Sequence, residues 1–570
     1  MRIDSLKLVG YRNYSNALIN FSANTLVIGS NDIGKTNMIH ALRILLDKSL
    51  SELDIEPKEI DFHINKDGDQ ANEIEIVITF CEVTEDAIVS LLKGYISDEG
   101  RTVIHYKAVR DNLNFEISIG QSVDDLELIN GRYYLKYLNM KYIHSQRDLE
   151  KFIQREKKYL LKISNENLEE KERQEDKRRV AAISRMLSRV NKNIGHLNYV
   201  SDATKNVNLE LSKLAHHNVG YSVHLGAGSI QVNSFIDKLD LGANSNGGEV
   251  MLGGDGRNNQ ILLALWKAKS IQEHDIENEV VIYCVEEPEA HLHPHQQRKL
   301  ADYLYTELPG QSIITTHSPQ ITSQYKPNSI IRLLSDDGAT RAASQGCSDC
   351  ISDAWDAMGY RMSILPSEAF FSSAVLLVEG PSERLFYTQI SKDFDIELDR
   401  LNISILSVDG VQFEVYRKIL DAMEIPWVMR TDNDVSKITA GGFLYSNFAG
   451  INRCYKIAGE EVLAHGKAGL CANDTVETGL WNEASQKLNV KGIFLSKVDL
   501  ESDLADELPA LVCEYSGSGT DLSAAIKYLQ DKKAIRMREF LKFTQGRREP
   551  LKDGELIKPI LKCRQIVTGV

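Results

Sequence analysis

The chain has 570 residues, which is too long for a single hydrophobic core and predicts about three or four folding units. Its composition is that of a water-soluble globular protein, and no uninterrupted apolar stretch is long enough to cross a bilayer. We therefore expect a cytoplasmic protein with no membrane partner. The net charge of −15 argues against a protein that coats nucleic acid over its whole surface, but it is compatible with local basic grooves.

A phosphate-binding loop is predicted near the N-terminus. The stretch GSNDIGKT, residues 29–36, matches the pattern G-x-x-x-x-G-K-[ST], with the apolar strand TLVI before it and a helical pattern after it. Backbone N–H groups of such a loop surround phosphates, its lysine reaches the terminal phosphates, and its threonine hydroxyl binds Mg²⁺. The predicted nucleotide-binding residues are Gly29, Asn31, Gly34, Lys35, Thr36 and Asn37.

A helical insertion is predicted from about residue 145 to 245. Here the sequence changes from alternating strands and helices to long, highly charged helical segments such as RDLEKFIQREKKYLLKI. A glycine-rich loop, residues 253–256, then opens another helical pattern.

Two later strand-like segments end in polar residues suited to nucleotide chemistry. VVIYCVEEPE supplies Glu286, which can order the Mg²⁺ shell, and Glu287, which can orient or deprotonate an attacking water. SIITTHS ends in His317, which is placed to sense the terminal phosphate. A histidine standing alone in such a segment would more often be a core residue.

Four segments, in this order, resemble ATPases of the ABC and SMC/RecF class. They are GSNDIGKT, the glycine-rich loop, VVIYCVEEPE and SIITTHS. The resemblance implies an ABC/SMC-like ATPase domain over residues 1–348, with the helical insertion used for dimerisation. It also implies a homo-oligomer, dimer or tetramer, in which Gly254 and Gly256 complete the ATP site of a partner subunit. Leu252 stands where the class usually has a serine.

A second α/β unit is predicted over residues 349–570, and three clusters of acids follow its strand-like segments AVLLVEGPSE, PWVMRTDND and LSKVDLESDL. Carboxylates so crowded repel one another unless a cation neutralises them. Hard oxygen ligands favour Mg²⁺ or Mn²⁺, and two such ions can hold the attacking and leaving oxygens of a phosphodiester. The predicted metal ligands are Glu379, Glu383, Asp432, Asp434, Asp499, Glu501 and Asp503.

This acidic set resembles the Toprim fold, and an ABC-type ATPase followed by a Toprim unit resembles the OLD family of nucleases, in particular those of the Gabija anti-phage system. The resemblance implies that Lys533 stabilises negative charge on the scissile phosphate, with Lys532 as the alternative. It also implies double-stranded DNA as substrate and a helicase-like partner protein. The residues to which it gives catalytic roles are Glu379, Asp432, Asp434, Asp503 and Lys533, with Glu287 and His317 in the ATPase domain.

The sequence therefore predicts a nucleotide-regulated endonuclease that uses Mg²⁺ or Mn²⁺ to nick or cleave double-stranded DNA in anti-phage defence. ATP is expected to act as a signal, because hydrolysis of a phosphodiester is already downhill. The alternative is an SMC/RecF-like ATPase that clamps DNA during repair without cutting it. A topoisomerase is less favoured, since none of the 22 tyrosines is a recognisable nucleophile.

Overall fold

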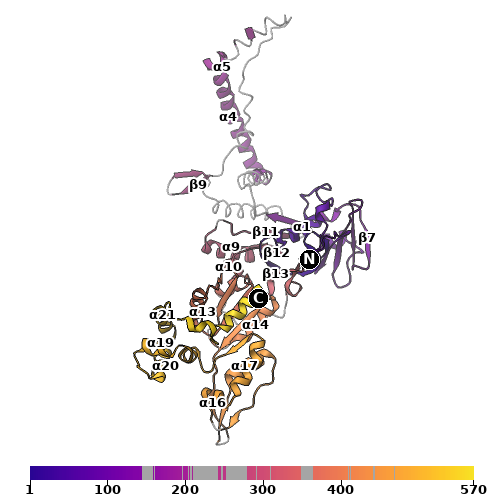
Figure 1. Ribbon diagram of the computed structural model, residues 1–570. Helices are drawn as coiled ribbons and strands as arrows, with labels where there is room; N and C mark the ends of the chain where they lie inside the picture. Colours follow the sequence, from indigo (N-terminus) through magenta and orange to yellow (C-terminus); the bar gives the residue numbers. More distant parts are fainter. Residues whose placement is uncertain are drawn as a thin grey trace. The chain divides into compact units, whose positions relative to one another are not determined.

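The computed structural model divides into two compact units, residues 1–144 with 276–289 and 294–570, and residues 145–275 with 290–293 (Figure 1). The structure describes residues 1–143, 164–195, 197–202, 242–245, 248–251, 279–347 except 291 and 309, and 364–569 except 409, 411, 441–442 and 468, with a few single positions between 158 and 209.

An antiparallel six-stranded sheet begins the first unit, in the order β2-β1-β4-β5-β6-β7. Along β1 and the second half of β5, buried side chains alternate with mostly half-buried ones, as expected for a sheet with one face on the core. The strands are β1 (Arg2–Tyr11), β2 (Tyr14–Asn20), β4 (Glu73–Cys81), β5 (Thr102–Val109), β6 (Asn114–Gly120) and β7 (Leu126–Leu128).

A second six-stranded sheet, in the order β14-β13-β3-β12-β11-β8, is parallel except for β14. Its strand β11 is buried along its whole length, which explains its nearly continuous apolar sequence. The helix α1 (Lys35–Leu46) follows β3 and contributes eight buried residues. The strands are β3 (Asn24–Ile28), β8 (Leu138–Ile143), β11 (Val280–Glu286), β12 (Ser312–Thr315), β13 (Ile330–Asp336) and β14 (Ala339–Ala342).

The C-terminal part of the same unit contains a parallel four-stranded sheet, in the order β16-β15-β17-β21. Because the strands are parallel, their carboxyl ends meet at one edge, where the acidic residues follow them. The strands are β15 (Ala374–Val378), β16 (Ile403–Ser407), β17 (Trp427–Thr431) and β21 (Ile493–Leu495).

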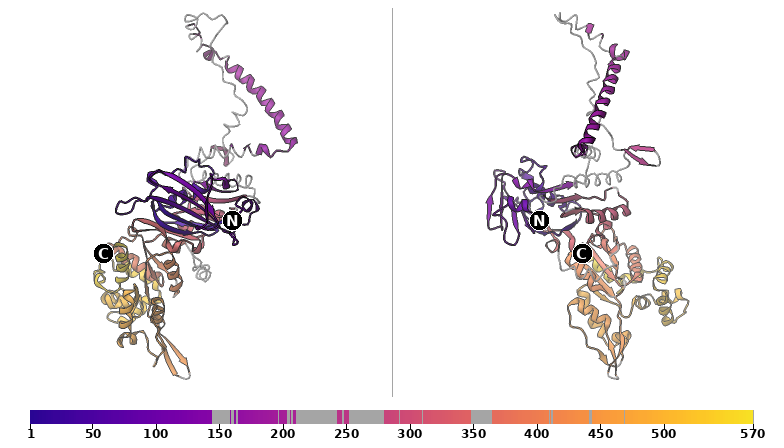
Figure 2. Two further views of the ribbon diagram at one scale, coloured as in Figure 1. Left: turned by 90° about the vertical axis from the view of Figure 1, so that its right-hand side faces the viewer. Right: turned by 180° about the vertical axis from the view of Figure 1, so that it is seen from behind.

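Helices and a small antiparallel sheet complete this part. The hairpin of β18 (Ser436–Ala440) and β19 (Phe443–Asn447) projects from it, and β19 also pairs with β20 (Gly466–Lys467) (Figure 2). The helices are α13 (Pro381–Asp393), α14 (Phe413–Ala422), α15 (Ala449–Ala458), α16 (Ala472–Glu477), α17 (Leu480–Val490), α18 (Leu500–Glu507), α19 (Pro509–Ser516), α20 (Leu522–Asp531), α21 (Lys533–Phe543) and α22 (Lys558–Thr568).

The second unit contains the long helix α4 (Glu170–Gly195), the short helix α5 (Asn198–Asp202) and the hairpin of β9 (Gly242–Ser245) and β10 (Gly248–Met251). Several large apolar side chains of α4 are exposed, among them Val180, Ile183 and Val190. Within the described residues, no helix is both long and apolar enough to span a bilayer.

Candidate functional site

The predicted phosphate-binding loop lies between β3 and α1, at the carboxyl edge of the parallel sheet. Lys35 is 7% exposed, and its Nζ donates hydrogen bonds to the carbonyl oxygens of Gly29 at 3.1 Å and Ser30 at 2.9 Å. Asn31 and Thr36 are exposed. The lysine charge is therefore held over the loop, with the threonine hydroxyl accessible at the start of the helix.

The turn between β1 and β2, which the sequence analysis did not assign, holds this loop in shape. Asn13 donates to the carbonyl oxygen of Ile33 at 2.7 Å and accepts from Asn37 at 2.6 Å, while Arg12 donates to the Asn37 side chain at 2.9 Å. Gly34 has a φ of 107°, and a Cβ added there would lie 1.9 Å from Nδ2 of Asn13. Only glycine fits this position.

Glu286, the last residue of β11, and Glu287, which follows it, face the same site. Glu286 is 2% exposed and accepts a hydrogen bond from the Tyr142 hydroxyl at 2.6 Å. Glu287 adopts a left-handed φ of 42°, a strained conformation that often marks functional residues. Its Oε1 lies 3.3 Å from Nε2 of His317. Burial, and then the charge of Lys35, lower the pKa of His317, so the imidazole is neutral at pH 7.

Glu289 is a further acid at this site that the sequence analysis missed. Its Oε1 accepts hydrogen bonds from the Thr316 hydroxyl and from the backbone N–H of His317, both at 2.7 Å. Burial raises the pKa of Glu289. This carboxylate fixes the turn after β12, and its place three residues after the first glutamate of EEPE was the available sequence signal.

These residues fit a nucleoside triphosphate with Mg²⁺. Lys35 can meet terminal phosphates, and Oε1 of Glu286 is buried with no hydrogen-bond partner among the residues the structure describes. Gly254 and Gly256, expected to complete a partner's site, lie outside the described residues.

The acidic cluster of the C-terminal part lies where the neighbouring strands β15 and β17 end. Glu379 follows β15, and its Oε1 accepts hydrogen bonds from the Thr431 hydroxyl and, at 2.9 Å, from the backbone N–H of Asp432. Asp432 follows β17 and is 7% exposed, while Asp434 is half exposed. The parallel sheet therefore brings the first two predicted acid clusters together.

Arg453, on α15, lies in the middle of this cluster. Its Nη2 is 3.0 Å from Oε1 of Glu379, 3.0 Å from Oδ2 of Asp434, 3.0 Å from the carbonyl oxygen of Asp432 and 2.6 Å from the Thr431 hydroxyl. The sequence indicates no role for this arginine, because nothing in the spacing of GINRCY relates it to acids about twenty and more than seventy residues away.

Lys533 approaches the same cluster from α21. Its Nζ lies 3.8 Å from Oδ2 of Asp432 and 3.9 Å from Oε2 of Glu501. Burial raises the pKa of Glu501 to about 7, and burial together with the Glu379 charge raises the pKa of Asp432 to about 8. Lys532 is exposed at the start of α21. These contacts favour Lys533 over Lys532 as the lysine of the site.

Two other predicted ligands have different surroundings. Glu383, in the first turn of α13, is buried, which raises its pKa. Asp499 caps α18 by accepting hydrogen bonds from the backbone N–H and hydroxyl of Ser502, at 2.9 and 2.6 Å, and it accepts a third from Gln530 at 2.7 Å. Both oxygens of Asp499 are therefore already in use.

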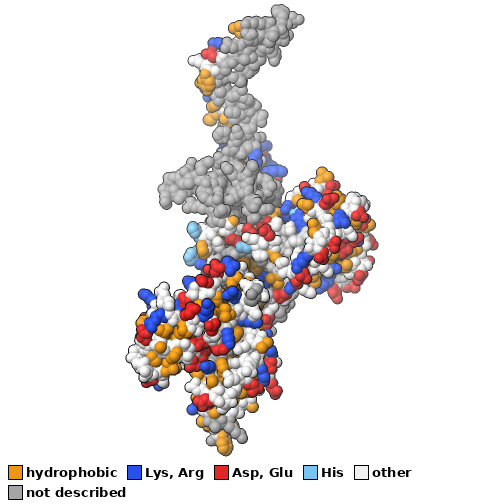
Figure 3. Space-filling view, viewed as in Figure 1, with side chains coloured by type: hydrophobic (Ala, Val, Ile, Leu, Met, Phe, Trp, Pro, Cys, Tyr) orange, Lys and Arg blue, Asp and Glu red, His pale blue; other side chains and the backbone are white. Residues whose placement is uncertain are grey.

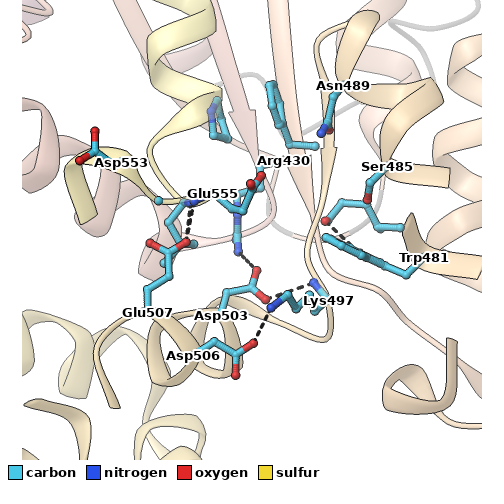
Figure 4. Close-up of a pocket in the computed structure, with 15 residues that line it drawn as sticks. Arg430, Trp481, Ser485, Asn489, Lys497, Asp503, Asp506, Glu507, Asp553 and Glu555 are labelled. Atoms are coloured by element: carbon cyan, nitrogen blue, oxygen red, sulfur yellow. Dashed lines mark hydrogen bonds and ion pairs between the residues drawn. The ribbon is translucent and has the colours of Figure 1, made fainter. Parts of the chain in front are cut away.

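Asp503 lines a separate cavity of about 270 Å³ (Figure 4). Its Oδ2 accepts from Nη2 of Arg430 at 2.7 Å, and its Oδ1 accepts from the backbone N–H of Lys497 at 3.1 Å. Arg430 is 3% exposed and lies on β17, two residues before Asp432. Asp503 thus neutralises a buried arginine behind the acidic cluster.

The donors at the edge of β15 and β17 fit a divalent cation in kind. They are hard oxygens. Nearby on α18, Oε1 of Glu501 is buried without a hydrogen-bond partner in the described part of the chain. No three His, Cys, Asp or Glu side chains in that part have the spacing to hold a metal ion. Arg453 and Lys533 supply positive charge among these oxygens instead.

Comparison with known families agrees with this arrangement. The family model described as an AAA ATPase domain matches residues 1–322, more than half of the 570 residues, so the chain belongs to that family. The model described as "Overcoming lysogenization defect protein-like, TOPRIM domain" matches residues 370–434. The predicted α/β fold, an ATPase domain followed by a C-terminal TOPRIM domain, is confirmed, as is the predicted class of enzyme, an ATPase joined to a TOPRIM nuclease domain.

Among individual proteins, the chain is similar to "Endonuclease GajA" of Bacillus cereus (strain VD045), with 25% identity over 584 aligned positions and 95% of each chain covered. It is also 27% identical to "OLD nuclease" of Thermus scotoductus over 161 positions, which cover 26% of this chain and 30% of that one. The predicted resemblance to OLD-family nucleases, and to GajA among them, is confirmed.

Two solved structures of SMC heads also match. The SMC head bound to the C-winged helix domain of ScpA has a TM-score of 0.38 and 19% identity, with 60% of this chain and 97% of that chain covered. The SMC head domain from Thermotoga maritima has a TM-score of 0.32 and 13% identity, with 60% and 98% covered.

Proposed function

We propose that the protein is a nucleotide-regulated, divalent-metal-dependent endonuclease that nicks or cleaves double-stranded DNA in anti-phage defence. The observation that carries the proposal is the meeting of Glu379 and Asp432 at the ends of β15 and β17, with Lys533 facing Asp432 and Glu501. The similarity to GajA and OLD nuclease supports it.

In the proposed reaction Glu379, Asp432 and Asp434 would hold Mg²⁺ or Mn²⁺. When bound, such an ion polarises the scissile phosphate and lowers the pKa of a bound water. Lys533, whose ammonium group lies beside Asp432 and Glu501, stabilises the negative charge that develops on the phosphate oxygens. Arg430, paired with Asp503, places a fixed positive charge behind β17 and limits the repulsion among these acids.

Incubation with supercoiled plasmid and Mg²⁺ or Mn²⁺ tests the proposal. An endonuclease converts the plasmid to open circles or linear DNA, and EDTA stops the conversion. Plasmid that stays supercoiled, although the protein binds it, would instead support an SMC/RecF-like clamp. Relaxed closed circles would indicate a topoisomerase.

Changing Lys533 to alanine should lower the single-turnover cleavage rate by about 100-fold or more, while DNA affinity changes by less than about threefold. The reason is that the ammonium group is needed most where charge develops on the reacting phosphate. The exposed neighbour Lys532 provides the matched control, because Lys532→Ala removes the same charge one residue away. Equal loss of rate in both variants would assign the lysines to general DNA attraction.

Double-stranded DNA is the proposed substrate, and α21 with the loop after it offers a basic surface for it. This segment carries Lys533, Arg536, Arg538, Lys542 and Arg547, of which Arg536 pairs with Asp531 and Arg547 with Glu514. Over the coloured residues in Figure 3, acidic and basic side chains are interspersed. DNA contact is therefore expected to be local rather than spread over the whole surface.

A homo-oligomer, dimer or tetramer, is proposed from the insertion. The exposed apolar side chains Val180, Ile183 and Val190 recur along α4 at a spacing of three and seven residues, which places them on one face of the helix. A second copy of this helix would cover that face. The resemblance to GajA also leads us to propose a separate helicase-like partner protein of the GajB type.

ATP is proposed to regulate cleavage rather than to drive it, and a chain of contacts between the two sites supports this. Arg332 on β13 pairs in register with Ile28, the residue before the phosphate-binding loop, and its Nη1 donates to the carbonyl oxygens of Met423 and Glu424, both at 3.0 Å. Arg341 on β14 binds the Glu424 carboxylate at 2.8 and 2.6 Å. Glu424 lies shortly before β17, and Asp432 directly follows that strand.

Breaking this contact should weaken the influence of ATP on cleavage. We expect Arg341→Gln to keep the ATP affinity and the ATP-free nicking rate within about twofold, while the change in nicking rate caused by saturating ATP falls by at least half. Arg400→Gln, at an exposed ion pair with Glu397, is the matched control. Nicking by the Arg341 variant that responds to ATP as fully as the wild type would rule out this path.

A further inference from the structure

The Nη2 atom of Arg453 has more oxygen neighbours than it has hydrogens. An Nη nitrogen carries two hydrogens, yet four oxygens lie within 3.0 Å of it, from Glu379, Asp434, Thr431 and the Asp432 backbone. Two of these are carboxylate oxygens, one is a hydroxyl and one is a carbonyl. The atom thus lies in an oxygen-lined position with the chemistry of a site for a hard cation.

We propose that Arg453 is an internal cation that occupies a divalent-metal position of this cluster and competes with the ion for it. This inference rests on the proposed function, since it concerns the same acids. It assigns to Arg453 the task of neutralising Glu379 and Asp434 while the metal is absent, and of setting how much metal the protein needs before it cuts.

The burial of Arg453 makes the competition a strong one. The side chain is 12% exposed, and its Nε is buried with no hydrogen-bond partner among the described residues. The acidic oxygens at the Nη2 end are therefore the main polar anchor of the guanidinium. Because arginine stays charged at every physiological pH, loss of its own proton cannot remove it from the site.

The same geometry predicts what happens when a divalent ion takes these oxygens. The Nη2 nitrogen and the metal ion cannot occupy the same position among these oxygens, and their charges repel, so the guanidinium has to turn away. Removal of the guanidinium should have two opposite effects, tighter metal binding and a less stable metal-free protein. A merely structural arginine would give only the second effect.

The test is Mn²⁺ binding, followed by the loss of the free-ion signal in electron paramagnetic resonance, on full-length protein freed of metal with EDTA and kept free of nucleotide. We expect Arg453→Gln to bind Mn²⁺ at the TOPRIM site about tenfold more tightly than the wild type. In urea with EDTA, its unfolding midpoint should be lower, and Mn²⁺ should raise that midpoint more than it does for the wild type.

Two variants provide the controls. Lys456→Gln removes an equal charge from the same helix, at an exposed lysine 3.2 Å from Glu414, and should leave Mn²⁺ affinity unchanged. Arg453→Lys keeps a positive charge on a shorter side chain. It replaces Arg453→Gln in the test if the glutamine variant does not fold, and its Mn²⁺ affinity should be higher than that of the wild type.

The outcomes separate this inference from the proposed function. Two results would overturn the role of Arg453 alone. One is an Arg453→Gln variant that binds Mn²⁺ only as tightly as the wild type. The other is weaker Mn²⁺ binding by that variant or by a folded Arg453→Lys. A different result would refute the metal site itself. If Glu379→Gln removes none of the Mn²⁺ binding of the wild type or of either Arg453 variant, the proposed metal site is wrong.

Discussion

Replacing Glu379 by alanine should abolish DNA cleavage, with a loss of at least about 1,000-fold, because the change removes a proposed metal ligand, the carboxylate that accepts a hydrogen bond from the backbone N–H of Asp432. The protein should stay folded. Glu379 is one cause of the raised pKa of Asp432, so its removal relieves repulsion in the metal-free cluster and offsets the loss of one of the four oxygen partners of Arg453. The measurement is the conversion of supercoiled to open-circle plasmid, with thermal unfolding of the same samples.

Glu397→Ala is the matched control for this prediction, since it removes an exposed glutamate that pairs with the neighbouring Arg400 on the protein surface. Glu379→Gln adds a stricter test, because the amide keeps an acceptor for Thr431 and for the backbone of Asp432 while it loses the charge. Full activity of either Glu379 variant would place the chemistry elsewhere in the chain.

Replacing Lys35 by alanine should lower ATP affinity by at least about 100-fold, because the lysine is the positive charge of the phosphate-binding loop. The proposed regulation adds a second expectation. Nicking by the wild type should fall as ATP rises through the millimolar range at constant free Mg²⁺, whereas nicking by Lys35→Ala should stay flat. Free Mg²⁺ has to be held constant because ATP also chelates it.

Linkage gives an independent check on this prediction. If ATP changes the affinity for DNA, DNA must change the affinity for ATP by the same factor. Such a coupling typically has a free energy of about 1–3 kcal/mol.

Lys48→Ala is the control for Lys35→Ala, because it removes an exposed lysine just beyond α1. A wild-type nicking rate that does not respond to ATP, or a Lys35 variant inhibited as strongly as the wild type, would show that nucleotide does not act through this loop.

Much of both sites was predictable because short motifs follow buried strands. An apolar run fixes the strand, and the polar residue after it must lie at the carboxyl edge of a parallel sheet, which is how Glu286, Glu379 and Asp432 could be placed. The phosphate-binding loop was predictable for the same reason, with Gly34 required by the close approach of Asn13.

The residues that escaped prediction come from other parts of the chain. Tyr142 meets Glu286 across 144 positions, and Arg453 meets Glu379 across 74, and neither has a spacing or a motif that relates it to its partner. Asp503 shows the converse limit. Its place in an acidic run predicts a metal ligand, and no pattern in the sequence marks the buried Arg430 that binds it in the structure.

Metal-dependent cleavage is tested most directly by measuring metal occupancy and cleavage in the same sample. Bound Mn²⁺ and the rate of open-circle formation are measured together across a Mn²⁺ titration of nucleotide-free protein on supercoiled plasmid, with Glu379→Ala beside the wild type. We predict that nicking rises in step with the Mn²⁺ that the Glu379 variant fails to bind, and stops when EDTA removes it. Nicking with no Mn²⁺ bound, or a fully occupied TOPRIM site with the plasmid left intact, would contradict this prediction.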